Sequence, residues 1–170
     1  MRILLCCKSA SDRSQFPTVT RIRGVALILE RGSALFVGVK KYDRRGKEIQ
    51  FPDFNHIEHG HVASGWLRVS HRELDEEKST PHQPWLKHKR LLKLKENEIV
   101  PVEIEILPSS TLFRSGESLV LVVQGNEIVT SDLMPSRYGH TETVNRGEHV
   151  IFAGGKYDSH LLVPVIPSGD

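Results

Sequence analysis

The chain has 170 residues, a formal net charge of +2, 38% hydrophobic residues and 26% charged residues. This length suits one domain with a sizeable core, and the composition is that of an ordinary globular protein. The charge is too small to indicate a nucleic-acid partner, and no basic cluster is interleaved with aromatic residues. The adjacent residues Cys6 and Cys7 are poorly placed for a disulfide, so the sequence favours a reducing, cytoplasmic location.

The N-terminal stretch lacks hydrophobic periodicity. We expect residues 1–20 to form a disordered or divergent leader ahead of one domain at 21–170. An apolar run precedes Lys8, but it is shorter than the core of a signal peptide and far shorter than a membrane-spanning helix. The sequence therefore predicts no targeting segment and no membrane partner.

The first half of the domain reads as strands separated by turns. The predicted strands of this half are 21–30, 34–42, 47–51 and 62–71. In the second of them Leu35, Val37 and Val39 share one face, because side chains alternate along a strand. Asp at the first position and Gly at the fourth make residues 43–46 a type I turn, which predicts a hairpin.

A charged segment with two prolines, residues 72–96, follows these strands. It predicts a long surface excursion with a short helix near 85–93. The basic run from Lys87 to Lys95 favours a solvated face. Long loops in compact domains often lie at functional or contact surfaces, which draws attention to this segment.

Two strands at about 98–125 carry the clearest pattern in the chain. In the first, apolar residues alternate with Glu103 and Glu105, which predicts one buried face and one wet face. In the second, the unbroken apolar run from Leu119 to Val123 predicts a strand that is buried on both faces.

The C-terminal part is predicted to contain an irregular loop at 126–147 and strands at 148–153 and 158–166. No long segment has helical periodicity. Roughly seven to nine strands with turn residues between them predict an all-β, antiparallel sandwich or jelly roll.

Histidines make the most tempting metal site. His56, His59 and His61 lie within six residues, and neutral imidazoles bind zinc or nickel. Their spacing matches neither a helical pair nor a familiar zinc pattern, so a solvated loop is the favoured interpretation. The Gly154-Gly155 pair is too short for a phosphate-binding loop. We expect no metal and no cofactor.

Two short stretches contain the residue types of a hydrolytic triad. In residues 158–160 (Asp-Ser-His) the serine projects to the strand face opposite its neighbours, so the hydrogen-bonded chain of a triad cannot form. Residues 70–72 (Ser-His-Arg) fail for similar reasons. No Gly-x-Ser-x-Gly nucleophile elbow occurs in the sequence. We therefore assign no catalytic residue to this chain.

Carboxylates and tryptophans are the remaining candidates. The carboxylates that crowd one loop are Glu73, Asp75, Glu76 and Glu77. Paired carboxylates perform acid–base work, but a solvated surface is the commoner role. Trp66 and Trp85 could stack on a sugar ring, although a core or interface role is the favoured interpretation.

Four stretches together carry a resemblance to a known family. They are residues 36–43 (Phe-Val-Gly-Val-Lys-Lys-Tyr-Asp), 65–75 (Gly-Trp-Leu-Arg-Val-Ser-His-Arg-Glu-Leu-Asp), 101–117 (from Pro-Val-Glu-Ile-Glu-Ile to Phe-Arg-Ser-Gly-Glu) and 145–164 (from Asn-Arg-Gly-Glu-His to Gly-Gly-Lys-Tyr-Asp-Ser-His-Leu-Leu-Val-Pro). In this order they resemble the C-terminal domain of Xaa-Pro dipeptidyl-peptidase and cocaine-esterase-type (CocE/NonD) serine hydrolases. The resemblance covers residues 34–167.

The resemblance implies a jelly-roll, galactose-binding-like β-sandwich. In the family this domain follows an α/β-hydrolase domain that carries the catalytic Ser, Asp and His, packs on it and helps to shape its pocket. None of the family's catalytic motifs is present here, so none of its catalytic residues is carried over and we expect the chain to be inactive alone.

The implied partner is therefore an α/β-hydrolase catalytic domain, with self-association left open. Two alternatives stay open as well. The chain could be a stand-alone sandwich that binds carbohydrate or protein, or a truncated gene fragment.

Overall fold

The computed structural model describes the backbone of residues 5–8, 15–17, 21–28, 34–52, 58–95, 98–128, 149–154 and 156–163. Side chains are described for residues 34–52, 60–95, 98–128, 150–154 and 156–163. Within these ranges the elements are strands and a single 3₁₀ turn. No helix among the described residues is long and apolar enough to cross a membrane.

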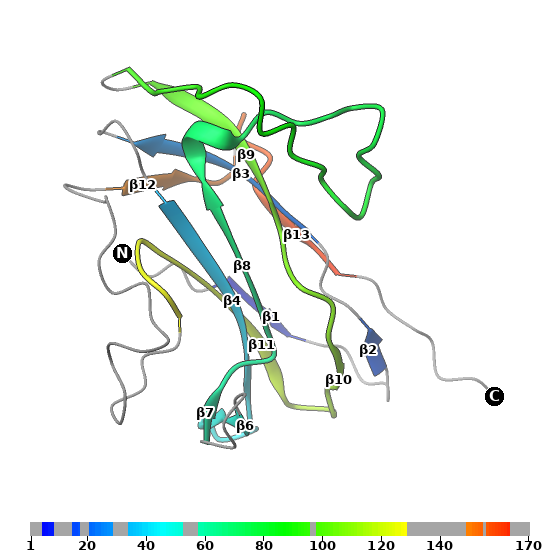
Figure 1. The fold of residues 1–170 in the computed structure, drawn as a ribbon. Coiled ribbons are helices and arrows are strands. Elements are labelled where there is room, and N and C mark those ends of the chain that lie inside the picture. Colours follow the sequence, from blue (N-terminus) through cyan, green and yellow to red (C-terminus); the bar gives the residue numbers. More distant parts are fainter. Residues whose placement is uncertain are drawn as a thin grey trace.

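The larger sheet is centred on β4 (Ala34–Tyr42), as Figure 1 shows. One edge of β4 pairs with β11 (Ser118–Gln124). The opposite edge is shared by β8 (Ala63–Arg68) and β5 (Glu48–Ile49). β1 (Leu5–Lys8) pairs with the far edge of β11, which completes a five-stranded antiparallel sheet.

The smaller sheet repeats this plan around β3 (Arg21–Ile28). One edge of β3 pairs with β9 (Ile99–Glu105). The other edge is shared by β12 (His149–Phe152) and β13 (His160–Leu162). Each sheet therefore has one long central strand, and all of these pairings are antiparallel.

Two short pairs of strands lie outside the main sheets. β2 (Gln15–Pro17) pairs with β10 (Ser110–Leu112), and β6 (Phe51–Pro52) pairs with β7 (Glu58–Gly60). Within residues 1–20, where the sequence suggests a disordered or divergent leader, the described backbone thus contains β1 and β2.

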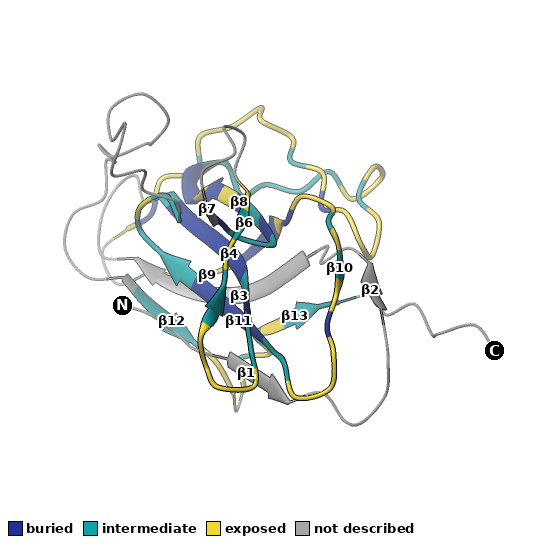
Figure 2. Ribbon diagram, turned by 90° about the horizontal axis from the view of Figure 1, so that it is seen from below, coloured by how far each residue is buried: buried dark blue, intermediate teal, exposed yellow. Residues whose placement is uncertain are grey.

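One hydrophobic core lies between the sheets. Figure 2 shows buried segments on the strands that face each other inside the molecule. The buried apolar residues of this core are Leu35, Val37, Val39, Ala63, Leu67, Val69, Leu94, Val100, Val102, Ile104, Ile106, Phe113, Leu119 and Leu121. Leu35, Val37 and Val39, which are predicted to share one face, are all buried, but burial does not alternate along β4, because Phe36 is buried as well. The doubly buried strand predicted from Leu119 is confirmed for residues 119–122. The observed architecture confirms the predicted all-β sandwich.

The predicted short helix near 85–93 is wrong. The described backbone there is irregular and forms hydrogen bonds with the start of the same excursion. Leu86 makes a bridge with Leu74, and the Lys87 N–H donates to the Glu73 carbonyl at 2.8 Å. These non-local bonds satisfy backbone groups that a helix would pair four residues away.

The predicted strand at 62–71 ends earlier than expected. The strand β8 stops at Arg68, and residues Val69–His71 form the 3₁₀ turn η1. The basic run from Lys87 to Lys95 is solvated as predicted, since all its charged side chains are exposed.

A buried ion pair fastens β4 to the segment that leads into β11. Lys41 is only 8% exposed, and its Nζ lies 2.8 Å from Glu117 Oε2. The same ammonium donates to the Leu112 carbonyl at 2.7 Å and lies 5.4 Å from the centre of the Phe113 ring. Burial alone raises the pKa of Glu117, but hydrogen bonds from Lys41 and from the Arg114 N–H outweigh burial and lower it overall.

A close backbone approach joins the two sheets at one edge. A Cβ on Gly65 of β8 would lie 1.9 Å from the carbonyl oxygen of Glu105, the last residue of β9. Beside it the Leu107 N–H donates to the Ser64 carbonyl at 2.9 Å. Only glycine allows the two backbones to come this close.

We expect Glu117→Gln to reduce the free energy of unfolding at neutral pH by about 1–3 kcal/mol, because Lys41 stays buried without its anion. Since folding lowers the pKa of Glu117 from 4.5, its contribution is present above pH 4.5 and is lost as the pH falls through the lowered value. Urea unfolding between pH 3 and pH 7 measures this. The variant should show a smaller loss of stability in acid than the wild type; identical acid profiles would contradict the assignment.

We expect Gly65→Ala to destabilise the chain by about 3 kcal/mol, because the methyl group would clash with a backbone carbonyl that cannot rotate away. Gly46→Ala is the matched control: its φ is +78° but nothing lies within 4 Å of the added Cβ. The control should therefore lose only about 1–2 kcal/mol. Equal losses in chemical denaturation would show that the close approach is not a constraint.

Candidate functional site

A groove lies on the outer side of the sandwich where β8 and β9 meet the excursion at 72–95. It encloses about 310 Å³. The lining residues that bear on function are Trp66, Gln83, Trp85, His88, Glu105 and Leu107. Both tryptophans of the chain thus belong to one site, although they are distant in sequence.

Trp66 reaches the groove because of strand alternation. Ala63, Gly65 and Leu67 face the core, so Trp66 projects outward and is 62% exposed. Trp85 is 48% exposed. The core role favoured for these tryptophans is therefore wrong, whereas an interface role stays a prediction.

Hydrogen bonds join the start and the end of the excursion that carries Trp85. Arg72 Nη1 donates to the carbonyls of Val69 at 3.2 Å and Leu92 at 2.7 Å. The Leu92 N–H donates to the Ser70 carbonyl at 2.8 Å. These bonds join the two ends of the excursion, which Figure 1 shows as the green trace extending from the sheets.

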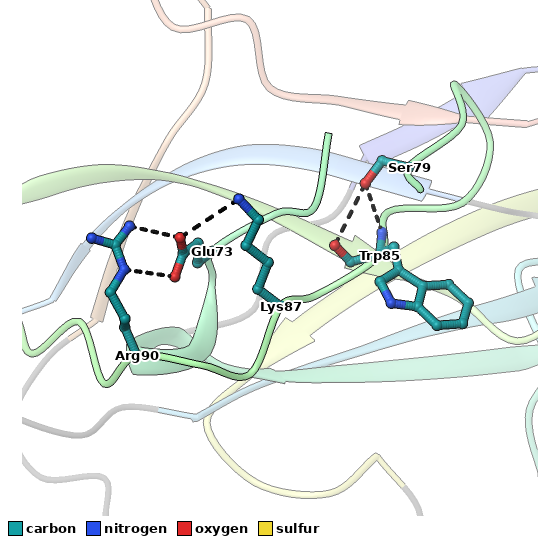
Figure 3. Close-up of polar contacts among 5 residues, drawn as sticks. All are labelled: Glu73, Ser79, Trp85, Lys87 and Arg90. Atoms are coloured by element: carbon teal, nitrogen blue, oxygen red, sulfur yellow. Dashed lines mark hydrogen bonds and ion pairs between the residues drawn. The ribbon is translucent and has the colours of Figure 1, made fainter. Parts of the chain in front are cut away.

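An ion pair joins the two limbs of the excursion. Glu73 accepts hydrogen bonds from Arg90 Nε at 3.0 Å and Arg90 Nη2 at 2.6 Å, and Lys87 Nζ lies 3.9 Å away, as Figure 3 shows. The hydrogen bond from Arg90 is the main reason that the pKa of Glu73 is lowered, and the charges of Arg90, Lys87 and Lys89 add to it. Glu73 therefore pairs with cations rather than with another carboxylate.

Both backbone groups of Trp85, the carbonyl and the N–H, are hydrogen-bonded. The Asp75 N–H donates to the Trp85 carbonyl at 2.7 Å, and the Trp85 N–H donates to Ser79 Oγ at 2.9 Å. The Ser79 hydroxyl also lies 3.5 Å from the Trp85 carbonyl (Figure 3). Lys78 Nζ lies 5.7 Å from the centre of the indole. The indole is thus exposed on a backbone that is held by hydrogen bonds.

Polar groups also line the groove. Gln83 Nε2 donates to Glu105 Oε1 at 3.0 Å, which links the excursion to β9. Glu105 is exposed as predicted, but the prediction that Glu103 is wet is wrong, since it is 7% exposed. Both residues line the groove, so the excursion folds over this part of β9.

His88 lines the groove with an unusual backbone. Its φ is +52°, in the left-handed region that residues other than glycine seldom adopt. Its ring centre lies 5.7 Å from that of His71. Residues held in such conformations gather at binding sites, where the surrounding structure maintains the strain.

The histidines suggested as a metal site are only partly described. His61 is half-buried, whereas the side chains of His56 and His59 lie outside the described residues. In the part of the chain that the structure describes, no group of three or more His, Cys, Asp or Glu could hold a metal ion.

In the apparent triad, the serine bonds to a backbone carbonyl while the histidine and the aspartate lie close together. Ser159 Oγ donates to the Phe152 carbonyl at 2.5 Å, while His160 Nδ1 lies 3.3 Å from Asp158 Oδ1. The serine proton is therefore not shared with the histidine. Gly154 adopts a φ of +82° and forms a tight turn that ends with Tyr157, and Gly155 lies outside the described residues.

The second stretch, residues 70–72, also lacks a nucleophile–base bond. The buried Ser70 hydroxyl has no hydrogen-bond partner among the described residues. Arg72 holds backbone carbonyls instead of a reacting group. In the crowded loop Asp75 accepts backbone hydrogen bonds from Lys78 and Ser79, and Glu76 and Glu77 are exposed.

Gln83, His88 and Leu107 are groove residues that the sequence did not single out. The bridge between Leu74 and Leu86 folds the segment that carries Gln83 and His88 back on itself, and the bond from the Leu107 N–H to the Ser64 carbonyl holds Leu107 beside β8. No local sequence pattern predicts such a bridge. The unusual length of the excursion was the one signal that this segment lies at a functional or contact surface.

Comparisons with known proteins place the chain among hydrolase domains. The model of the X-Pro dipeptidyl-peptidase C-terminal non-catalytic domain matches residues 21–162. Two crystal structures of a CocE/NonD family hydrolase from Staphylococcus aureus are similar to it, with 51% and 50% identity and TM-scores of 0.89 and 0.90. The matches cover 97% and 98% of this chain but only 30% of each hydrolase chain. No curated protein matches the sequence.

We expect Glu73→Gln to loosen the excursion, because Arg90 and Lys87 lose their anionic partner. Hydrogen exchange followed by mass spectrometry should then be faster in peptides from residues 72–95, which include the amides of Asp75 and Lys87. Glu76→Gln is the control, since it removes an exposed carboxylate from the same excursion. Unchanged exchange in Glu73→Gln would mean that the backbone bonds alone hold the excursion.

Proposed function

Because this chain belongs to the family of X-Pro dipeptidyl-peptidase C-terminal non-catalytic domains, we propose that it serves as the accessory β-sandwich of a serine hydrolase. The family suggested by the four sequence stretches is confirmed. In the proposed role the sandwich packs on an α/β-hydrolase domain and shapes its pocket. The parent activity is serine-dependent hydrolysis of a peptide, ester or amide.

One observation carries this proposal. The chain is about half identical to a hydrolase over nearly its own full length, yet it spans only 30% of that hydrolase. The similar segment therefore corresponds to a domain-sized part of a larger enzyme. This supports a jelly-roll domain at 21–170 with a catalytic domain as its partner.

The surface offers apolar groups for such packing. Large hydrophobic residues that are exposed and lie outside the groove are Leu91, Ile99 and Leu112. These residues lie on the excursion, β9 and β10, where packing against a partner domain would bury them. The proposed cytoplasmic location rests on the cysteine usage alone.

The chemistry of the proposed parent enzyme belongs to the partner domain. Acyl transfer needs a serine that is activated by a neighbouring base. Here Ser159 is engaged with a backbone carbonyl and Ser70 is buried, so neither hydroxyl is presented to a substrate with a base beside it. The chain's own part in hydrolysis is thus packing and positioning.

A chimera tests the proposal. The segment of the Staphylococcus aureus hydrolase that this chain matches is replaced by residues 1–170. We expect the chimera to hydrolyse a nitrophenyl ester or a Gly-Pro amide and the isolated chain to hydrolyse neither. A soluble but inactive chimera would contradict the accessory role. Turnover by the isolated chain, checked with a serine-reactive fluorophosphonate, would contradict the assignment of catalysis to the partner.

A further inference from the structure

We propose that the groove between Trp66 and Trp85 binds a neutral pyranose unit of an oligosaccharide. This site would belong to the sandwich itself, so the inference does not depend on the proposed hydrolase partner. It rests on the exposed indoles, on the polar groups that line the same groove and on the backbone hydrogen bonds that hold the excursion.

The two indoles are the first argument. Large aromatic side chains are seldom left this exposed on a globular protein, and here the only two tryptophans of the chain are exposed at the same groove. An indole offers a flat apolar face together with an N–H donor. The C–H face of a pyranose ring is apolar and flat, and it stacks on such a surface.

The polar groups are the second argument. The Glu105 carboxylate accepts one hydrogen bond from Gln83 and has capacity for more, while the Gln83 amide keeps its own carbonyl acceptor and a second N–H. The exposed imidazole of His88 adds a group that donates or accepts. Sugar hydroxyls both donate and accept, so they match this mixed set.

Other classes of ligand fit less well. Glu103 and Glu105 repel an anion. Lys78 already lies over the Trp85 ring, so a cationic ligand would meet a like charge there. A wholly apolar ligand would desolvate the Gln83 and Glu105 side chains without replacing their bonds to water.

Size and rigidity support the same ligand class. The volume of about 310 Å³ is at the lower end of the range of roughly 300–1,000 Å³ for ligand pockets, which suits one or two sugar rings. The hydrogen bonds from Asp75 and to Ser79 fix the backbone of Trp85 before any ligand arrives. A preorganised site loses less entropy on binding.

The chain reports on this site directly. Since both tryptophans line the groove, emission excited in the indole band comes from the groove alone. The 170-residue chain is titrated with methyl α- and β-glycosides of glucose, galactose, mannose, xylose and N-acetylglucosamine, and with the disaccharides of each. We expect a saturable change in emission with at least one of these sugars, confirmed by titration calorimetry.

Variants then test the residues. Trp66→Ala and Trp85→Ala should each weaken binding of the responding sugar at least tenfold, and Glu105→Gln should weaken it several-fold. Leu91→Ala and Glu76→Gln are matched controls, an exposed apolar residue and an exposed carboxylate outside the groove lining, and should bind as the wild type does. Because the altered side chains are exposed, all variants should keep the wild-type melting temperature.

The proposal is overturned if no sugar of the panel gives a saturable response, or if a response survives both tryptophan substitutions. It is also overturned if the tryptophan variants impair only the hydrolase chimera, since the groove would then be a contact between domains. A chimera that stays active while sugar binding is absent would reject the sugar site and leave the accessory role intact.

Discussion

The approach of Gly65 to the Glu105 carbonyl is the constraint on which both the sandwich and its groove depend. Without a Cβ at Gly65, β8 of the larger sheet can reach the end of β9 in the smaller sheet. The same contact sets the direction of the neighbouring side chains: Trp66 must project outward, and Glu105 is exposed beside it. The same close contact therefore closes the core between the two sheets and places the groove residues on the outer surface.

The excursion at 72–95, which forms the rest of the groove, is held by many weak bonds and not by one strong contact. The Glu73–Arg90 pair is partly exposed, and pairs of this kind add little stability by themselves. The backbone hydrogen bonds of Asp75, Lys87 and Leu92 recur along the whole excursion, and together they turn a long charged loop into a defined arm. Irregular backbone can position a side chain as firmly as a strand when its polar groups are paired.

Sequence reasoning succeeded where a pattern was local. The strand at 34–42 was predicted with its observed bounds, because its alternation ends at a turn marked by Asp43 and Gly46. It failed where a distant segment decided the outcome. Glu103 looked solvent-facing from its alternation, but it is buried in the lining of the groove to which the excursion also contributes. Residues 85–93 looked helical, but their backbone pairs with Ser70, Glu73 and Leu74.

The groove could not be predicted from the sequence either, because distant segments form it. Trp66 and Trp85 drew attention singly, but only the bridge between Leu74 and Leu86 brings their segments together. The centre of a surface made for domain packing is depleted of charged groups. This groove instead stays hollow, and its lining includes Gln83 and Glu105, which have hydrogen-bonding capacity to spare. That combination describes a site shaped for a small polar ligand.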